Sequence, residues 1–94
     1  MERWQLQDPQ NLVADETSLA AIDAELVRAR LKHPGRKHLL AALVEEVGEL
    51  AQAILQQKPK SAIDKEAAQV AAVAVRIMEE GDAAFDVKDW APTP

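Results

Sequence analysis

The chain has 94 residues, enough for one domain that buries a modest share of its surface, and 48% of them are hydrophobic. It contains no cysteine, which excludes disulfide scaffolds and thiol chemistry, and its net charge of −5 speaks against binding to a nucleic-acid polymer. No segment approaches the roughly 18 apolar residues of a membrane span, and no signal-peptide pattern opens the chain, so we expect a cytoplasmic protein without a membrane partner.

The N-terminal part of the chain predicts an irregular arm followed by a helix. Residues 1–15 contain Asp8-Pro9 and mixed polar residues, and Trp4, Leu6 and Leu12 are candidates to anchor this arm. A first helix is predicted from residues 16–18 to 32, with Thr17 or Ser18 as its cap. Helical spacing assigns four apolar residues to its inner face: Leu19, Ile22, Leu26 and Val27.

Two further helices are predicted between the remaining Pro and Gly residues. Pro34-Gly35 separates the first helix from a second one over residues 36–57, and Pro59 ends the second. Ser61 is predicted to cap a third helix that closes at Gly81, and residues 82–94 are predicted to be a C-terminal tail that packs through Phe85 and Trp90. We therefore expect one all-α domain over residues 1–94, a small helical bundle with three main helices.

The second and third helices share one layout, in which acidic residues border a broad apolar face. Glu46 and Glu49, three residues apart, lie on that border of the second helix, and Glu66, Gln69 and Arg76 lie on the equivalent border of the third. If the two helices form an antiparallel hairpin, the borders converge into one pocket of three carboxylates and one amide. These hard oxygen ligands suit Mg²⁺ or Mn²⁺ better than zinc.

The apolar faces of these helices are wider than a monomer of this size is able to cover. Leu39, Leu43, Val47, Leu50 and Ile54 form one stripe of the second helix, and neighbouring apolar residues broaden it. Association would bury the remainder, so we expect a homodimer or homotetramer that completes the bundle.

The acidic residues resemble the signature of the MazG-like, all-alpha nucleoside triphosphate pyrophosphohydrolases. That family carries Glu-Glu-x-x-Glu on one helix and Glu-x-x-Asp on the next, and Glu45-Glu46-x-x-Glu49 matches the first element. The second is matched at Glu66, whereas Gln69 stands where the family has Asp. The resemblance covers residues 37–80 and implies hydrolysis of a nucleoside triphosphate to monophosphate and pyrophosphate with Mg²⁺.

The resemblance also implies roles for individual residues. Glu46, Glu49 and Glu66 would be metal ligands, with Gln69 as a fourth that carries no charge. Glu45 would be the catalytic residue that orients water, or would support the site by interacting with the metal ligands.

Two basic residues are candidates for substrate binding. Arg76 is placed either to bind phosphate or to balance the carboxylates. Lys37 belongs to a basic cluster at the turn before the acidic helix that would meet a triphosphate, although such clusters are more often a solvated helix junction.

Two alternatives to an enzyme remain open from the sequence. Gln69 and the wide apolar faces also fit a non-catalytic helical module that binds a nucleotide or a protein and has a degenerate metal site. The third interpretation is a purely structural bundle in which the acidic residues are a solvated face, and it predicts no stabilisation by metal.

Overall fold

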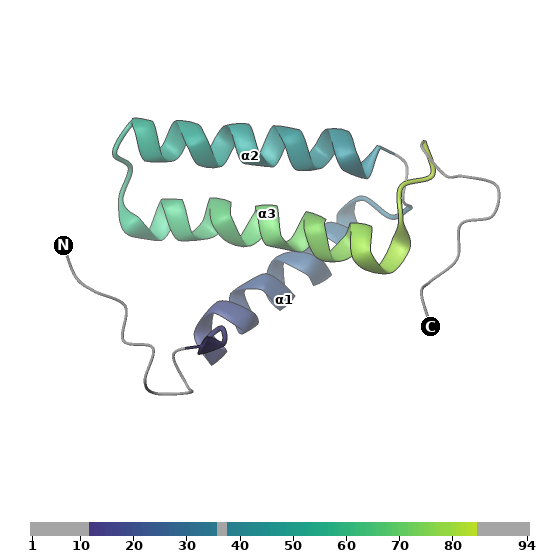
Figure 1. Ribbon diagram of the computed structural model, residues 1–94, viewed down its shortest axis with the longest axis horizontal. Helices are drawn as coiled ribbons and strands as arrows, with labels where there is room; N and C mark the ends of the chain where they lie inside the picture. The colour runs from purple at the N-terminus through teal and green to yellow at the C-terminus, as the bar shows by residue number, and fades with distance from the viewer. Residues whose placement is uncertain (1–11, 36–37, 85–94) are drawn as a thin grey trace.

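Three helices make up the architecture of the protein. The computed structural model describes residues 12–35 and 38–84, and the order of elements is α1 (Glu16–Lys32), α2 (Leu39–Leu55) and α3 (Lys60–Glu80). Figure 1 shows α2 and α3 side by side as an antiparallel hairpin, with α1 crossing them at an angle. The predicted all-α fold and the predicted helical hairpin are therefore confirmed.

Helix α1 begins at Glu16, as predicted, but its cap differs from the predicted one. Asp15 has extended backbone angles and accepts a hydrogen bond from the N–H of Ser18 at 2.7 Å, so the cap is Asp15 rather than Thr17 or Ser18. The predicted inner face is right for Leu26, which is buried, but wrong for Leu19 and Val27. Those two side chains are 49% and 57% exposed, because α1 packs against α3 and not against α2, so one side of it is covered.

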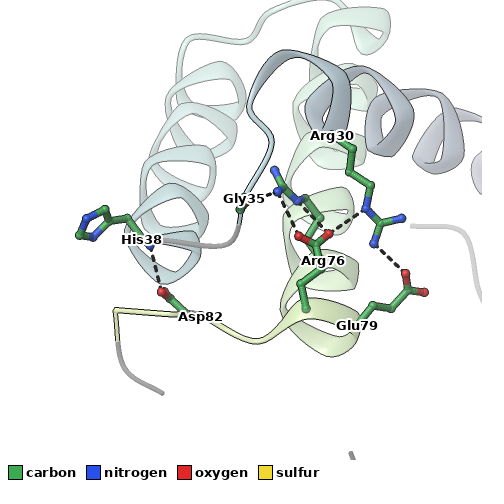
Figure 2. Close-up of polar contacts among 7 residues, drawn as sticks. Arg30, Gly35, His38, Arg76, Glu79 and Asp82 are labelled. Carbon is green, nitrogen blue, oxygen red and sulfur yellow. Dashed lines mark hydrogen bonds and ion pairs between the residues drawn. The ribbon is translucent and has the colours of Figure 1, made fainter. Parts of the chain in front are cut away.

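The N-terminus of α2 is capped by a residue that follows the C-terminus of α3. His38 lies in the left-handed region at φ 64° and supplies no side-chain cap of its own. Instead, the Asp82 carboxylate accepts hydrogen bonds from the N–H groups of His38 at 2.9 Å and Leu40 at 2.7 Å, the first of which is drawn in Figure 2. The predicted start at residue 36 was wrong, because a left-handed residue at 38 cannot continue a right-handed helix.

A tight turn joins α2 to α3. Gln57 adopts φ 56°, and hydrogen bonds from Lys58 N–H to the Ala53 carbonyl and from Gln57 N–H to the Ile54 carbonyl, both 3.0 Å, form a Schellman motif. Helix α2 consequently ends at Leu55, two residues before the predicted Gln57. The backbone at Lys58 is held by this motif, so the position of that residue beside the two helices is well defined.

Helix α3 is the central element because it contacts both α1 and α2. Pro59 is its N-cap, and its carbonyl accepts from the N–H groups of Ala62 and Ile63, so the predicted cap Ser61 lies one residue inside the first turn. The small residues Ala68 and Ala72 are buried and allow the neighbouring helices to approach closely.

Hydrogen bonds join the C-terminus of α3 to α1 and to the α1–α2 connection. Arg76 is only 4% exposed, and its guanidinium donates to the Gly35 carbonyl and to Glu80, whose carboxylate also accepts from Arg30 at 2.8 Å (Figure 2). Gly81 closes α3 as predicted, with φ 71°, a conformation that suits glycine. This turn brings Asp82 to the start of α2.

The core of the single chain is small. The structure buries these apolar residues among those it describes: Leu26, Leu39, Ala53, Ala68 and Ala72. By contrast, a row of large apolar side chains on α2 is between 45% and 82% exposed: Leu40, Val44, Val47, Ile54 and Leu55. None of the described helices has the length and apolarity needed to cross a membrane.

Candidate metal centre

Three carboxylates meet where α2 and α3 run side by side. Glu46 and Glu49 come from consecutive turns of α2, and Glu66 comes from the second turn of α3. Each offers one oxygen, and these oxygens all lie within 4.8 Å of one another. We call these three residues the carboxylate cluster. The structure thus brings together the three acids that the sequence assigned as metal ligands, and their role as ligands stays a prediction.

The carboxylate cluster is electrostatically costly without a cation. Partial burial raises the pKa of Glu46, and the nearby charges of Glu49, Glu66 and Glu45 add to this effect, while Arg28 opposes it. A divalent cation would compensate this repulsion, and carboxylate oxygens are its preferred ligands. The donor set and its spacing therefore fit a divalent metal ion.

Gln69 lies against the cluster, as predicted, but it presents hydrogen-bond donors. With its amide nitrogen towards α2, Gln69 donates to Glu46 Oε2 and Glu66 Oε2, both at 3.1 Å, and its oxygen accepts from Arg28 Nη2 at 3.0 Å. The opposite orientation leaves the nitrogen a single contact of 3.4 Å to Glu25 and sets the oxygen against the carboxylates. The first orientation satisfies more polar groups and is preferred.

Two hollows flank the cluster on opposite sides. The first, of about 290 Å³, is bounded by all three helices and includes Glu46 and Gln69 beside apolar side chains such as Leu39 and Val73. The second, of about 420 Å³, lies towards the α2–α3 turn and includes Glu49 and Glu66 beside mostly polar side chains. We call these the apolar hollow and the polar hollow. The cluster thus contributes walls to both.

The other predicted site residues are not members of the cluster. Glu45 is exposed on α2 next to Glu46, so its predicted catalytic role stays a prediction. Arg76 lines the apolar hollow, yet its guanidinium is engaged by Gly35 and Glu80 and not by the cluster. Lys37, the second predicted substrate-binding residue, lies outside the described residues, as do Trp4, Phe85 and Trp90.

Sequence reasoning missed two residues of α1 that border the site. Glu25 and Arg28 line the apolar hollow and form an ion pair at 2.6 Å, and Arg28 reaches the Gln69 amide. The available signal was their i, i+3 spacing with opposite charges beside the buried Leu26. That spacing alone would not have shown that α1 crosses the hairpin at this point.

The fold and the cluster together define a small all-α protein with a candidate metal centre between two antiparallel helices. The MazG nucleotide pyrophosphohydrolase domain matches residues 35–93, and the chain belongs to this family. The match extends past residue 80, where the resemblance noted in the sequence ended, so the tail is part of the family pattern, whereas α1 lies outside it. No curated protein and no solved structure shows a significant match to the chain.

Proposed function

We propose that this protein is a metal-dependent pyrophosphohydrolase that converts a nucleoside or deoxynucleoside triphosphate and water to the monophosphate and pyrophosphate. The observation that carries the proposal is the convergence of Glu46, Glu49 and Glu66 oxygens within 4.8 Å in a chain of the MazG family. Mg²⁺ is the proposed ion and Mn²⁺ its substitute, because all the ligands are hard oxygens.

The roles of the residues follow from their chemistry. Glu46, Glu49 and Glu66 would hold the cation, which supplies charge neutralisation for the polyphosphate and lowers the pKa of bound water. Glu45, exposed beside Glu46, is the proposed residue that orients water through its carboxylate. The apolar hollow, whose lining combines aliphatic side chains with the Glu25–Arg28 pair, is suited to the nucleoside.

The test is pyrophosphate release from a panel of ribo- and deoxyribonucleoside triphosphates, with and without Mg²⁺ or Mn²⁺. Glu49→Gln removes one ligand charge and should lower metal-dependent release by about 100-fold or more. Glu16→Gln makes the same change in the exposed first turn of α1 and serves as the matched control. Full activity in Glu49→Gln would remove the cluster from the mechanism.

A second candidate is a helical module that binds nucleotide without hydrolysing it. It is favoured by the orientation of Gln69, whose amide nitrogen donates to Glu46 and Glu66, two of the proposed ligands. In that case the wild-type protein binds nucleoside triphosphate and releases no pyrophosphate from any member of the panel. The same assay, combined with equilibrium dialysis of the nucleotide, separates the two candidates.

A further inference from the structure

The two hollows beside the carboxylate cluster differ in the chemistry of their walls. The apolar hollow combines aliphatic side chains such as Leu39 and Val73 with polar and charged ones, whereas the polar hollow has only two alanines beside Glu49, Glu66, two glutamines and Lys58. A nucleoside triphosphate has one weakly polar end and one highly charged end, so a site that straddles the cluster has to distinguish them. The residues that line the two hollows indicate which hollow receives the nucleoside and which receives the phosphates.

The available positive charge lies on the polar side. Of the arginines in the apolar hollow, Arg28 is paired with Glu25 at 2.6 Å and Arg76 with Glu80 at 3.1 Å. Among the described lysines and arginines that line either hollow, Lys58 is the one without an ion pair. An ammonium group next to acidic side chains is a suitable ligand for phosphate oxygens once those acids are neutralised by a cation.

The backbone of Lys58 is placed by the fold. The Schellman motif at the end of α2 fixes its N–H on the Ala53 carbonyl, and Pro59 follows directly as the N-cap of α3. The side chain therefore starts from a fixed point at the rim of the polar hollow. Lys60, only two residues further on, is engaged elsewhere, since its ammonium contacts Asp64 at 2.6 Å.

We propose that the polar hollow binds the pyrophosphate portion of the substrate and that Lys58 contacts it, so that the triphosphate runs from the cluster towards the α2–α3 turn. The nucleoside then lies on the opposite side, against α1. This inference rests on the proposed function, because it assigns the two ends of its substrate to the two hollows. It identifies Lys58 as a binding residue for the leaving group.

Calorimetry in the presence of Mg²⁺ tests the assignment, with inorganic pyrophosphate and a nucleoside monophosphate as separate probes. Lys58→Ala should raise the Kd for pyrophosphate by about tenfold and leave the Kd for the monophosphate unchanged. Lys60→Ala removes the same charge two residues away and should leave both values unchanged. The unchanged monophosphate affinity also shows that the variant is folded.

Three results would overturn the inference: equal pyrophosphate affinity in Lys58→Ala and wild type, weaker binding of the monophosphate instead, or no pyrophosphate binding by the wild type. Turnover of nucleoside triphosphates by the wild type is measured in parallel. If the wild type hydrolyses these substrates but Lys58→Ala binds pyrophosphate normally, the proposed function stands and only the assignment of the polar hollow fails. If the wild type hydrolyses none of them, the proposed function fails, whatever the affinity of Lys58→Ala for pyrophosphate.

Discussion

Gln69 is the residue that decides how strongly the carboxylate cluster attracts a cation. An amide ligates a hard cation only through its oxygen, yet the hydrogen bonds of Gln69 turn its nitrogen towards Glu46 and Glu66. Without metal, these two donors relieve part of the repulsion within the cluster. They therefore compete with the cation for two of its proposed ligands, Glu46 and Glu66.

Gln69→Asp should raise the affinity for Mn²⁺ by about tenfold, because it adds a negative charge and removes the competing donors. The metal-free variant should also melt at a lower temperature than the wild type, since it loses two hydrogen bonds and gains repulsion. Calorimetric titration with Mn²⁺ and thermal melts with and without the ion measure both effects. Ala67→Asp adds the same charge on another face of α3 and is the control. Unchanged affinity in Gln69→Asp would contradict this view of Gln69.

Arg76 illustrates how one sequence position supports two interpretations that only packing can separate. Its spacing from Gln69 predicted a residue beside the cluster, and it does line the apolar hollow. However, its 4% exposure and its hydrogen bonds to Gly35 and Glu80 give it a structural task that no local pattern indicates. A buried guanidinium needs such partners, because an uncompensated buried charge is strongly destabilising. Its role in substrate binding stays a prediction.

At the scale of helices, local signals predicted the elements well and their ends less well. Helical spacing placed Glu46, Glu49 and Glu66 on facing borders, because that placement depends only on the 3.6-residue period and on an antiparallel hairpin. The start of α2 was predicted wrongly because its cap, Asp82, is supplied by tertiary contact from more than 40 residues away. No N-cap pattern near residue 38 reveals that contact.

The Asp82 cap makes the stability of the fold depend on pH. Its pKa is lowered from 3.8, first by the hydrogen bond from Leu40 N–H and also by those from Ala84 and His38. A lowered folded-state pKa means that the cap stabilises fully above the unfolded value of 3.8 and is lost as the pH falls through the folded value.

Asp82→Ala should therefore lower the melting temperature at pH 7, and the difference from wild type should shrink progressively below pH 3.8. Circular dichroism melts across this pH range measure the difference. Asp23→Ala, a change at an exposed position of α1, controls for the loss of a surface charge. A difference that persists undiminished in acid would show that Asp82 stabilises the start of α2 by some means other than its ionised carboxylate.

At the scale of the whole molecule, the chain is a thin layer of helices with one side uncovered. Its buried apolar residues are few and mostly small, whereas the outward stripe on α2 carries five large apolar side chains that are at least 45% exposed. A stripe of this kind on a small domain is more typical of an interface than of a solvated surface. We propose that a second copy of the chain covers it, in a homodimer or homotetramer.

Val44, at 64% exposure, lies between Leu40 and Val47 on that stripe, so Val44→Asp would bury a charge in the proposed interface. We expect this variant to sediment as a monomer at concentrations where the wild type sediments as a dimer or tetramer. Leu31→Asp makes a comparable change at an 80% exposed position of α1 and should leave the mass unchanged. Because the cluster lies between α2 and α3 and draws all three acids from one chain, the monomeric variant should still bind Mn²⁺. A wild type that is monomeric, or a Val44→Asp protein of unaltered mass, would show that the stripe is not the surface through which copies associate.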